Sequence, residues 1–259
     1  MSIIQQLLLK FPFFILGFII IGGAVAFSIS GLILVRYFFP HSKLKVSHEV
    51  ANPIFGALRA IYAVLLAFVV VTVWQNFEKS NSNVQQEANY LADIYRDAEA
   101  FSPEFRQQAY MLLREYRQAV VEDEWRTMAR GKMSSKVEGL MRKIFSLYSS
   151  YQPKNPAEQS FFSVSVQNLN SFRDLRRQRL MDSRTGINAL LWFVLIAGAL
   201  LTISFTFLFG AESLKAQIIM VVMLSMILSL ILFAVIEMDF PFTGKVSISS
   251  APFKQLLLD

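Results

Sequence analysis

Four long apolar stretches constrain the fold of this chain more than any other feature of its sequence. A helix needs about 20 residues, at a rise of 1.5 Å each, to cross the ~30 Å hydrocarbon core of a bilayer. We therefore expect membrane-spanning helices at Phe11–Val35, Asn52–Trp74, Ile187–Phe209 and Ala216–Ile236.

The charged residues gather between the second and third of these stretches. Of the 25 Lys and Arg residues, 17 lie between Gln75 and Gly186, together with 14 of the 19 acidic residues. A chain that lies partly in lipid and partly in water shows such segregation, because the bilayer core favours apolar residues. The pattern predicts an all-α membrane protein with four transmembrane helices and a helical soluble domain between the second and third. Its expected parts are helices 1 and 2 in residues 1–74, the soluble domain in 75–186, helices 3 and 4 in 187–238, and a tail in 239–259.

Start signals divide the soluble part into helices. Ser102-Pro103 and Asn155-Pro156 each place a capping side chain before a proline at the first helical position, and Gly131 is expected to close the helix that begins at Pro103. The predicted helices are Gln75–Ala100, Pro103–Ala129, Ser135–Tyr148 and Pro156–Asp182. Because no helix breaker separates the first from the second span or the last from the third span, we expect long helices to continue across the membrane boundary.

Small residues at helical spacing predict where two spans pack closely against other helices. They are Gly22, Ala26 and Ser30 in the first span, and Gly56, Ala60, Ala63 and Ala67 in the second. A cleaved signal peptide is a rival interpretation of the first span, because Ala24-Val25-Ala26 resembles a cleavage site. The apolar residues continue well past that point, which favours a membrane span.

Arg59 places a charge inside the second span. Such a charge costs about 2.5–3.5 kcal/mol on insertion scales, so it usually faces protein, water or an ion path. The alternative is a side chain that extends to the headgroups at the helix end. In the first case, a ring of such arginines in an oligomer would favour anions. Four further residues lie on a neighbouring face at helical spacing and are candidates to line the same path: Tyr62, Leu66, Val70 and Val73.

A run of arginines precedes the third span: Arg173, Arg176, Arg177 and Arg179. RNA binding is conceivable for such a run, but a basic cluster next to a membrane span is typical of a cytoplasmic boundary that contacts anionic lipid headgroups. We therefore expect membrane lipid, and no nucleic acid, as a partner. Near the membrane, eight basic residues on the side of the soluble domain against four on the other side favour cytoplasmic termini and a cytoplasmic domain.

Residues that could carry other chemistry are few. The chain has no cysteine, and its two histidines, His41 and His48, do not complete a metal site. The acidic cluster Glu122-Asp123-Glu124 lacks the alternating oxygen ligands of a calcium loop. We expect these acids to pair with arginines at 117, 126 or 130, and Trp125 to pack inside. No phosphate-binding glycine loop or catalytic arrangement is visible, so neither a cofactor nor an enzyme activity is expected.

Several segments are similar to those of the bacterial bestrophin-like domain family. They are the stretch from Ala60 through Val71 to Trp74, Ala119–Trp125, Phe207–Gly210, and the tail from Asp239-Phe240-Pro241-Phe242-Thr243-Gly244 through Pro252-Phe253. The matches occur in order over nearly the whole chain. Arg59 departs from the pattern, because an apolar or small residue is expected there.

The resemblance implies a distant relation to bestrophins, which are pentameric anion channels with four spans per subunit and a cytosolic helical region. In these channels the second span lines the pore, which would make Tyr62, Leu66, Val70 and Val73 the neck candidates by position. The acidic calcium clasp that follows the fourth span in bestrophins is not matched here. A bacterial inner-membrane location and a homo-oligomer are further expectations from the family.

Two functions remain open from the sequence. The first is an oligomeric, channel-like protein that passes small anions along the second span. The second is a membrane-anchored sensor or scaffold whose helical domain binds a ligand or a protein partner. A periplasmic position of the middle domain would favour the second.

Overall fold

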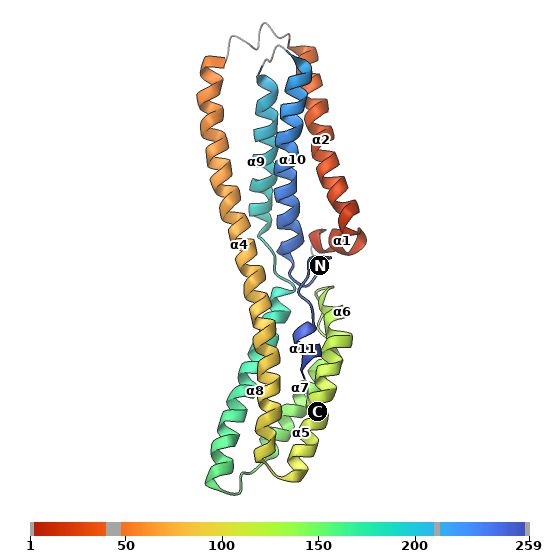
Figure 1. Ribbon diagram of the computed structural model, residues 1–259, viewed down its shortest axis with the longest axis vertical. Helices are drawn as coiled ribbons and strands as arrows, with labels where there is room; N and C mark the ends of the chain where they lie inside the picture. The colour runs from red at the N-terminus through yellow and green to blue at the C-terminus, as the bar shows by residue number, and fades with distance from the viewer. Residues whose placement is uncertain (1–2, 40–47, 210–212, 257–259) are drawn as a thin grey trace. The chain divides into compact units, whose positions relative to one another are not determined.

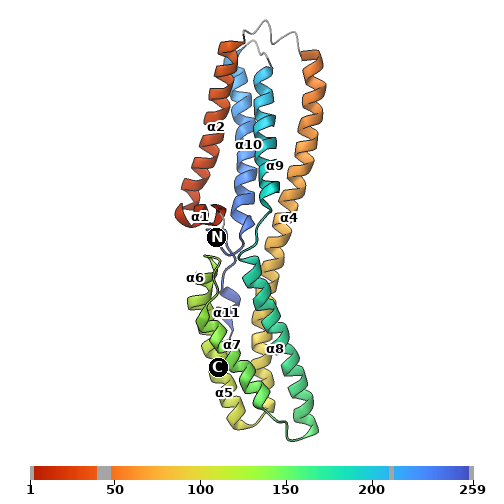
Figure 2. The ribbon, with the colours of Figure 1, turned by 180° about the vertical axis from the view of Figure 1, so that it is seen from behind.

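The computed structural model describes residues 3–39, 48–209 and 213–256, and all regular secondary structure in these ranges is helical (Figures 1 and 2). The chain divides into two compact units. The membrane unit comprises Gln6–Gln75 and Gly186–Asp239. The soluble unit comprises Asn76–Thr185, together with the segments that end at Gln5 and begin at Phe240.

Four helices are long and apolar enough to cross a membrane. They are α2 (Phe13–Phe38), the first half of α4 (His48–Asp97), α9 (Ala189–Phe205, extended by a 3-10 turn at Thr206–Leu208) and α10 (Leu214–Asp239). The short helix α1 (Ile3–Lys10) precedes them. The predicted fold class, an all-α protein with four candidate spans and a helical domain between the second and third, is confirmed.

Within the membrane unit, α9 and α10 lie between α4 and α2 in both views (Figures 1 and 2). Helix α2 packs along α10, where the hydroxyls of Ser28 and Ser225 lie 3.1 Å apart in a hydrogen bond. Glycines permit the close approach: a Cβ at Gly17 would lie 3.3 Å from the ring of Phe233. At Gly31 a Cβ would overlap the ring of Phe207 at 2.5 Å.

The predicted small-residue seams do not pack within the chain. In the first span, Ala26 and Ser30 are exposed, and a Cβ at Gly22 would meet nothing within 4 Å. In the second span, Ala60, Ala63 and Ala67 are exposed and a Cβ at Gly56 would also meet open space. Within the chain these seven residues do not pack against another helix, so their packing against a helix of another chain stays a prediction. Residue spacing shows which face is small, but it does not show which face the neighbouring helix occupies.

The soluble unit is a helical bundle built on the second half of α4. Its other helices are α5 (Pro103–Ala119), α6 (Trp125–Met128), α7 (Ser135–Ser150), α8 (Pro156–Asp182) and, in the tail, α11 (Ala251–Gln255). The predicted caps are confirmed: Ser102 accepts from the N–H of Phe105 at 3.4 Å, and Asn155 accepts from that of Glu158 at 2.9 Å. Gly131 closes the segment after α6 with a φ of 67°.

The bounds differ from the sequence expectation at two places. Helix α4 is continuous from His48 to Asp97, as predicted, but α8 ends at Asp182 and α9 begins only at Ala189. The expected continuation of the last soluble helix into the third span is therefore wrong. Asn188 caps the new helix by accepting from the N–H of Leu190 at 2.9 Å, which a continuous helix would not allow. The second difference is a π-helical turn at Val120–Glu124 within the predicted helix Pro103–Ala129.

The tail belongs to the core of the soluble unit. Phe242, Ile248 and Phe253 are buried there. The indole N–H of Trp125 donates to the carbonyl of Ile248 at 3.0 Å, and Arg117 donates to the carbonyl of Leu256 at 2.5 Å. The segment that follows α10 is thus held by both apolar packing and hydrogen bonds.

Candidate functional site

One face of α4 is buried against the membrane unit's own core. Tyr62, Leu66, Val69 and Val73 are buried and belong to one cluster with residues of α9 and α10. The hydroxyl of Tyr62 donates to the carbonyl of Leu195 at 2.9 Å. Tyr62, Leu66 and Val73 therefore pack inside their own subunit, and the lining of an ion path by these residues stays a prediction.

A groove nevertheless runs beside this buried face, between α4, α9 and α10. It consists of two adjoining hollows of about 460 Å³ and 510 Å³, which share Arg59, Thr202 and Leu224. The larger, strongly apolar hollow is bordered by four of the five predicted path residues: Arg59, Tyr62, Leu66 and Val70. Val73 does not border it. The sequence pattern thus identified one flank of a groove rather than an exposed stripe.

Arg59 lies at the junction of the two hollows, and its side chain is exposed. The guanidinium lies over the ring of Phe55, 5.9 Å from its centroid. Phe55 in turn stacks on Phe205 with ring centroids 5.2 Å apart. Among the residues that the structure describes, no carboxylate lies within ion-pair distance of Arg59. Its positive charge is therefore available to an anion from outside the described chain.

The smaller hollow is the more polar one. Its lining includes Asn52, Thr206 and Gln217. The amide of Gln217 accepts from Arg36 Nε at 3.1 Å and donates to the carbonyl of Phe209 at 2.5 Å. This buried amide therefore joins the end of α2 to the ends of α9 and α10. The result is a concave site at the end of the spans with one guanidinium in its wall and a second bound to its lining.

No metal centre accompanies this site in the described part of the chain, because no group of three or more His, Asp or Glu side chains is arranged to hold an ion there. His41 and the side chain of His48 lie outside the described residues. The site therefore combines the positive charge of Arg59 with an apolar hollow.

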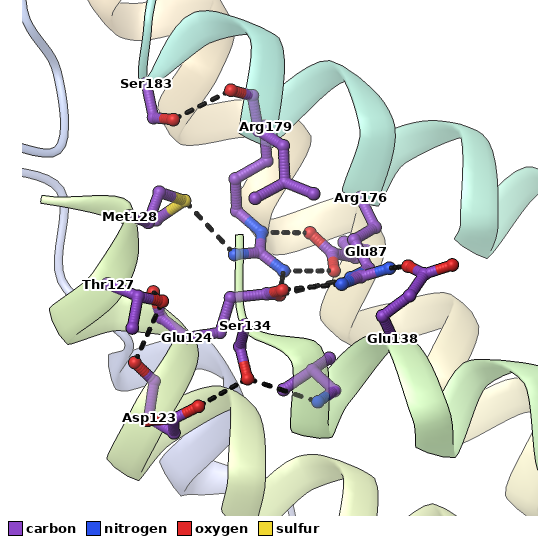
Figure 3. A network of polar contacts seen from close by, with 12 residues as sticks. Glu87, Asp123, Glu124, Thr127, Met128, Ser134, Glu138, Arg176, Arg179 and Ser183 are labelled. Carbon is purple, nitrogen blue, oxygen red and sulfur yellow. Dashed lines mark hydrogen bonds and ion pairs between the residues drawn. The ribbon is translucent and has the colours of Figure 1, made fainter. Parts of the chain in front are cut away.

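A second polar cluster lies in the core of the soluble unit (Figure 3). Arg179 donates to both oxygens of Glu87, at 2.6 and 2.8 Å, and to Glu124 at 2.9 Å. Arg176 donates to Glu124 at 2.6 Å and to Glu138 at 2.7 Å. Figure 3 shows the two guanidiniums side by side between these carboxylates. We call these five residues the buried ion network.

This network contradicts two sequence expectations. Arg176 and Arg179 are 3% and 0% exposed, so the predicted contact of these two side chains with lipid headgroups is wrong. Glu124 pairs with arginines of α8 rather than with Arg117, Arg126 or Arg130, because the π-helical turn ends at Glu124 and this carboxylate is buried. Trp125 packs against the core as expected, and Arg179 lies 4.7 Å over its ring.

Burial and ion pairing act against each other on the pKa of each network carboxyl. Complete burial raises the pKa of Glu87 above its ordinary value, although Arg179 opposes the rise. Burial also raises the pKa of Glu124, but Arg179 and Arg176 together outweigh it and hold that pKa below its ordinary value. Pairing also raises the pKa of both arginines, so they stay charged.

The other two arginines of the run are accessible to solvent. The side chain of Arg177 is 71% exposed and that of Arg173 is 43% exposed, and both lie near Asp174. Contact of Arg173 and Arg177 with lipid headgroups stays a prediction.

One known protein family matches most of the chain. The family model of the bestrophin-like domain matches residues 22–253, which include most of the first candidate span, the other three spans and most of the soluble unit. No curated protein and no solved structure matches the chain. The matched range covers most of the 259 residues, and the chain therefore belongs to the bestrophin-like domain family.

Proposed function

We propose that this protein is a homo-oligomeric, channel-like protein that passes small anions across the membrane along α4. Membership of the bestrophin-like domain family supports a membrane protein of the bestrophin type. The resemblance to bestrophins makes a pentamer the oligomer to test first, and chloride the anion. The apolar side chains of α4 that border the groove, Leu66 and Val70, form the constriction, and Arg59 supplies the selecting charge.

The observation that carries this proposal is the exposed guanidinium of Arg59 within an apolar span. Insertion of this charge costs several kcal/mol. No described carboxylate offsets the cost, and the guanidinium instead lines a groove with a second arginine at its polar end. A small anion that enters this groove gains a Coulombic partner in surroundings of low dielectric constant.

The exposed small residues of α4 support an assembly of several chains. Ala60, Ala63 and Ala67 leave a smooth surface beside the row that carries Arg59. Small side chains let helices of neighbouring subunits approach closely in a bilayer. A helix of the next subunit on this surface would close the groove into a conduit. The same surface would otherwise face lipid.

We further propose that both termini and the soluble unit lie in the cytoplasm of a bacterial cell, with the spans in its inner membrane. The basic residues near the spans support this orientation. With the buried Arg176 and Arg179 set aside, six such residues on the side of the soluble unit still stand against four on the other side.

Anion flux from proteoliposomes tests the proposal. The purified full-length protein should release trapped chloride when a cation ionophore balances the charge, and Arg59→Ala should reduce the flux severalfold because the selecting charge is lost. Arg59→Lys should retain more flux than Arg59→Ala. Arg177→Ala removes an exposed charge from the soluble unit and serves as the matched control with unchanged flux.

Absence of chloride release by well-folded wild-type protein would contradict the proposal. Equal flux in wild type and Arg59→Ala would leave conduction standing and remove Arg59 from the mechanism.

A further inference from the structure

The turn between α6 and α7 is a rigid, strongly basic feature of the soluble unit. Gly131 adopts a positive φ, its N–H donates to the carbonyl of Met128 at 2.8 Å, and that of Lys132 donates to Thr127 at 3.0 Å. Ser134 then caps α7 by accepting from the N–H of Val137 at 3.2 Å. The conformation of the turn is therefore fixed by its own hydrogen bonds.

This turn contacts the segments of the soluble unit that lead into the spans. The hydroxyl of Thr243 donates to the carbonyl of Ala129 at 2.9 Å. A Cβ at Gly131 would lie 3.8 Å from the side-chain oxygen of Gln5 and 3.9 Å from the Cγ of Arg184. Gln5 itself donates to the carbonyl of Ser183 at 2.8 Å. Chain segments from three different places meet at this turn.

Each of these contacts lies a short distance along the chain from a span. Ser183 is six residues before the start of α9, and Thr243 is four residues after the end of α10. An extended residue spans at most ~3.6 Å. The covalent chain therefore limits Thr243 to about 14 Å from the end of α10 and Ser183 to about 22 Å from the start of α9.

The exposed side chains at this end are mainly cationic. They are Arg126, Arg130, Lys132, Lys136, Arg184 and Lys245, which we call the basic turn surface. Fewer acids lie nearby: Asp123 bonds to Ser134, and Asp182 accepts from Ser80 at 2.8 Å, although a hydroxyl does not cancel the charge of a carboxylate. Glu122 is exposed, and it accepts from Gln118 at 3.0 Å. Met133, which is 45% exposed, projects an apolar side chain from among these cations.

We propose that the basic turn surface binds the headgroups of anionic phospholipids and that Met133 enters the headgroup region beside them. Each Lys or Arg held near an anionic leaflet contributes to such binding, and the contribution falls off within a Debye length. The apolar side chain adds burial that charge alone does not provide. This binding is independent of conduction, so it stands or falls separately from the proposed anion path.

The absence of cysteine from the sequence makes a direct test possible. Met133→Cys carries an environment-sensitive fluorophore at the surface, and Ser149→Cys carries the same fluorophore near the far end of α7. The full-length proteins are reconstituted into vesicles of phosphatidylcholine, with or without phosphatidylglycerol, that contain a nitroxide-labelled lipid. Quenching should be stronger at residue 133 than at residue 149, and phosphatidylglycerol should increase it at residue 133.

Charge variants complete the test. Arg130→Gln, Lys132→Gln and Lys136→Gln together should reduce quenching at residue 133 to its level in phosphatidylcholine alone. Salt at about 1 M, where the Debye length is about 3 Å, should do the same. Arg142→Gln, Lys143→Gln and Lys154→Gln remove as many exposed charges elsewhere on the soluble unit and should leave the quenching unchanged. Equal quenching at residues 133 and 149, or quenching that neither lipid charge nor the first triple variant alters, would overturn the proposal.

Discussion

The charged residues in the core of the soluble unit depend on their ion-pair partners. Arg179 and Glu87 are completely buried, and each satisfies the other with two hydrogen bonds. Glu124 holds both buried arginines at once. Such a network does not by itself stabilise a fold more than apolar packing would, but loss of one member leaves a charge that water cannot reach. These residues are therefore sensitive to substitution even though they lie away from the spans.

Glu124→Gln should destabilise the soluble unit, because it leaves Arg176 and Arg179 with one buried carboxylate between them. Breaking a buried pair costs about 3–5 kcal/mol. Glu138→Gln is the matched control, since that side chain is 36% exposed and an exposed ion pair contributes at most about 1 kcal/mol. Thermal unfolding of the purified protein, followed by tryptophan fluorescence, measures both. Equal midpoints for the two variants would contradict the assignment.

The pH dependence of stability should change in the same variant. The pKa of Glu124 is lowered in the fold, so its contribution is present above the unfolded pKa and is lost as pH falls through the lower folded pKa. For an ordinary glutamate that window begins near pH ~4.3. Glu124→Gln should therefore lose less stability than wild type between about pH 5 and pH 3. A steeper acid loss in the variant would contradict the direction.

The contribution of Glu87 to stability has the opposite pH dependence. Its pKa is raised, so its contribution is complete below the unfolded pKa and is lost as pH rises through the higher folded pKa. Glu124 is one cause of the raised pKa of Glu87, so Glu124→Gln also lowers that pKa and the comparison with wild type reports on both carboxyls.

At the scale of elements, the sequence predicted where helices begin but not which faces meet. Ser102, Asn155 and Gly131 act locally, so their roles follow from neighbouring residues alone. Packing faces depend on which helix becomes the neighbour. Gly198, which no sequence pattern marks, is the residue that lets the ring of Tyr62 approach α9. The burial of Glu87 did have a signal, because it continues the apolar spacing of Val84 and Leu91 along α4.

Gly198→Ala should weaken the contact between α4 and α9. A Cβ there would lie 2.4 Å from ring atoms of Tyr62, so the ring or the helix must move. Overpacking of this kind costs about 1–3 kcal/mol. Gly22→Ala is the control, because a Cβ at that position meets nothing within 4 Å in the chain. The thermal midpoint should fall for Gly198→Ala alone; a fall only for Gly22→Ala would contradict this packing.

At the scale of the whole molecule, composition was the most informative signal. The separation of apolar and charged stretches predicted four spans and one helical soluble domain, because lipid excludes charge regardless of fold detail. Composition did not predict which residues distant in the sequence form ion pairs. The partners of Arg176 and Arg179 come from α4 and a π-helical turn, more than 50 residues away in the chain, and from α7, where Glu138 lies 38 residues from Arg176. Pairing at such separations depends on how the bundle closes, which local patterns do not encode.

The orientation that follows from the basic residues is testable with single cysteines. Ser149→Cys in the soluble unit should react with a membrane-impermeant thiol reagent only after the inner membrane is opened. Lys215→Cys, at the start of α10, should react from the outside. Both positions are exposed, so access through the protein does not limit labelling. Outside labelling of Ser149→Cys would reverse the orientation and favour the sensor function instead.

The central claim is that an assembly of these chains passes small anions, and a planar bilayer recording measures this most directly. Purified oligomer is inserted between two potassium chloride solutions of different concentration, and the reversal potential of the current is read. We expect a reversal potential close to the equilibrium potential of chloride, shifted toward that of potassium in Arg59→Ala. A wild-type reversal potential at the potassium equilibrium potential, or no current from a verified oligomer, would contradict it.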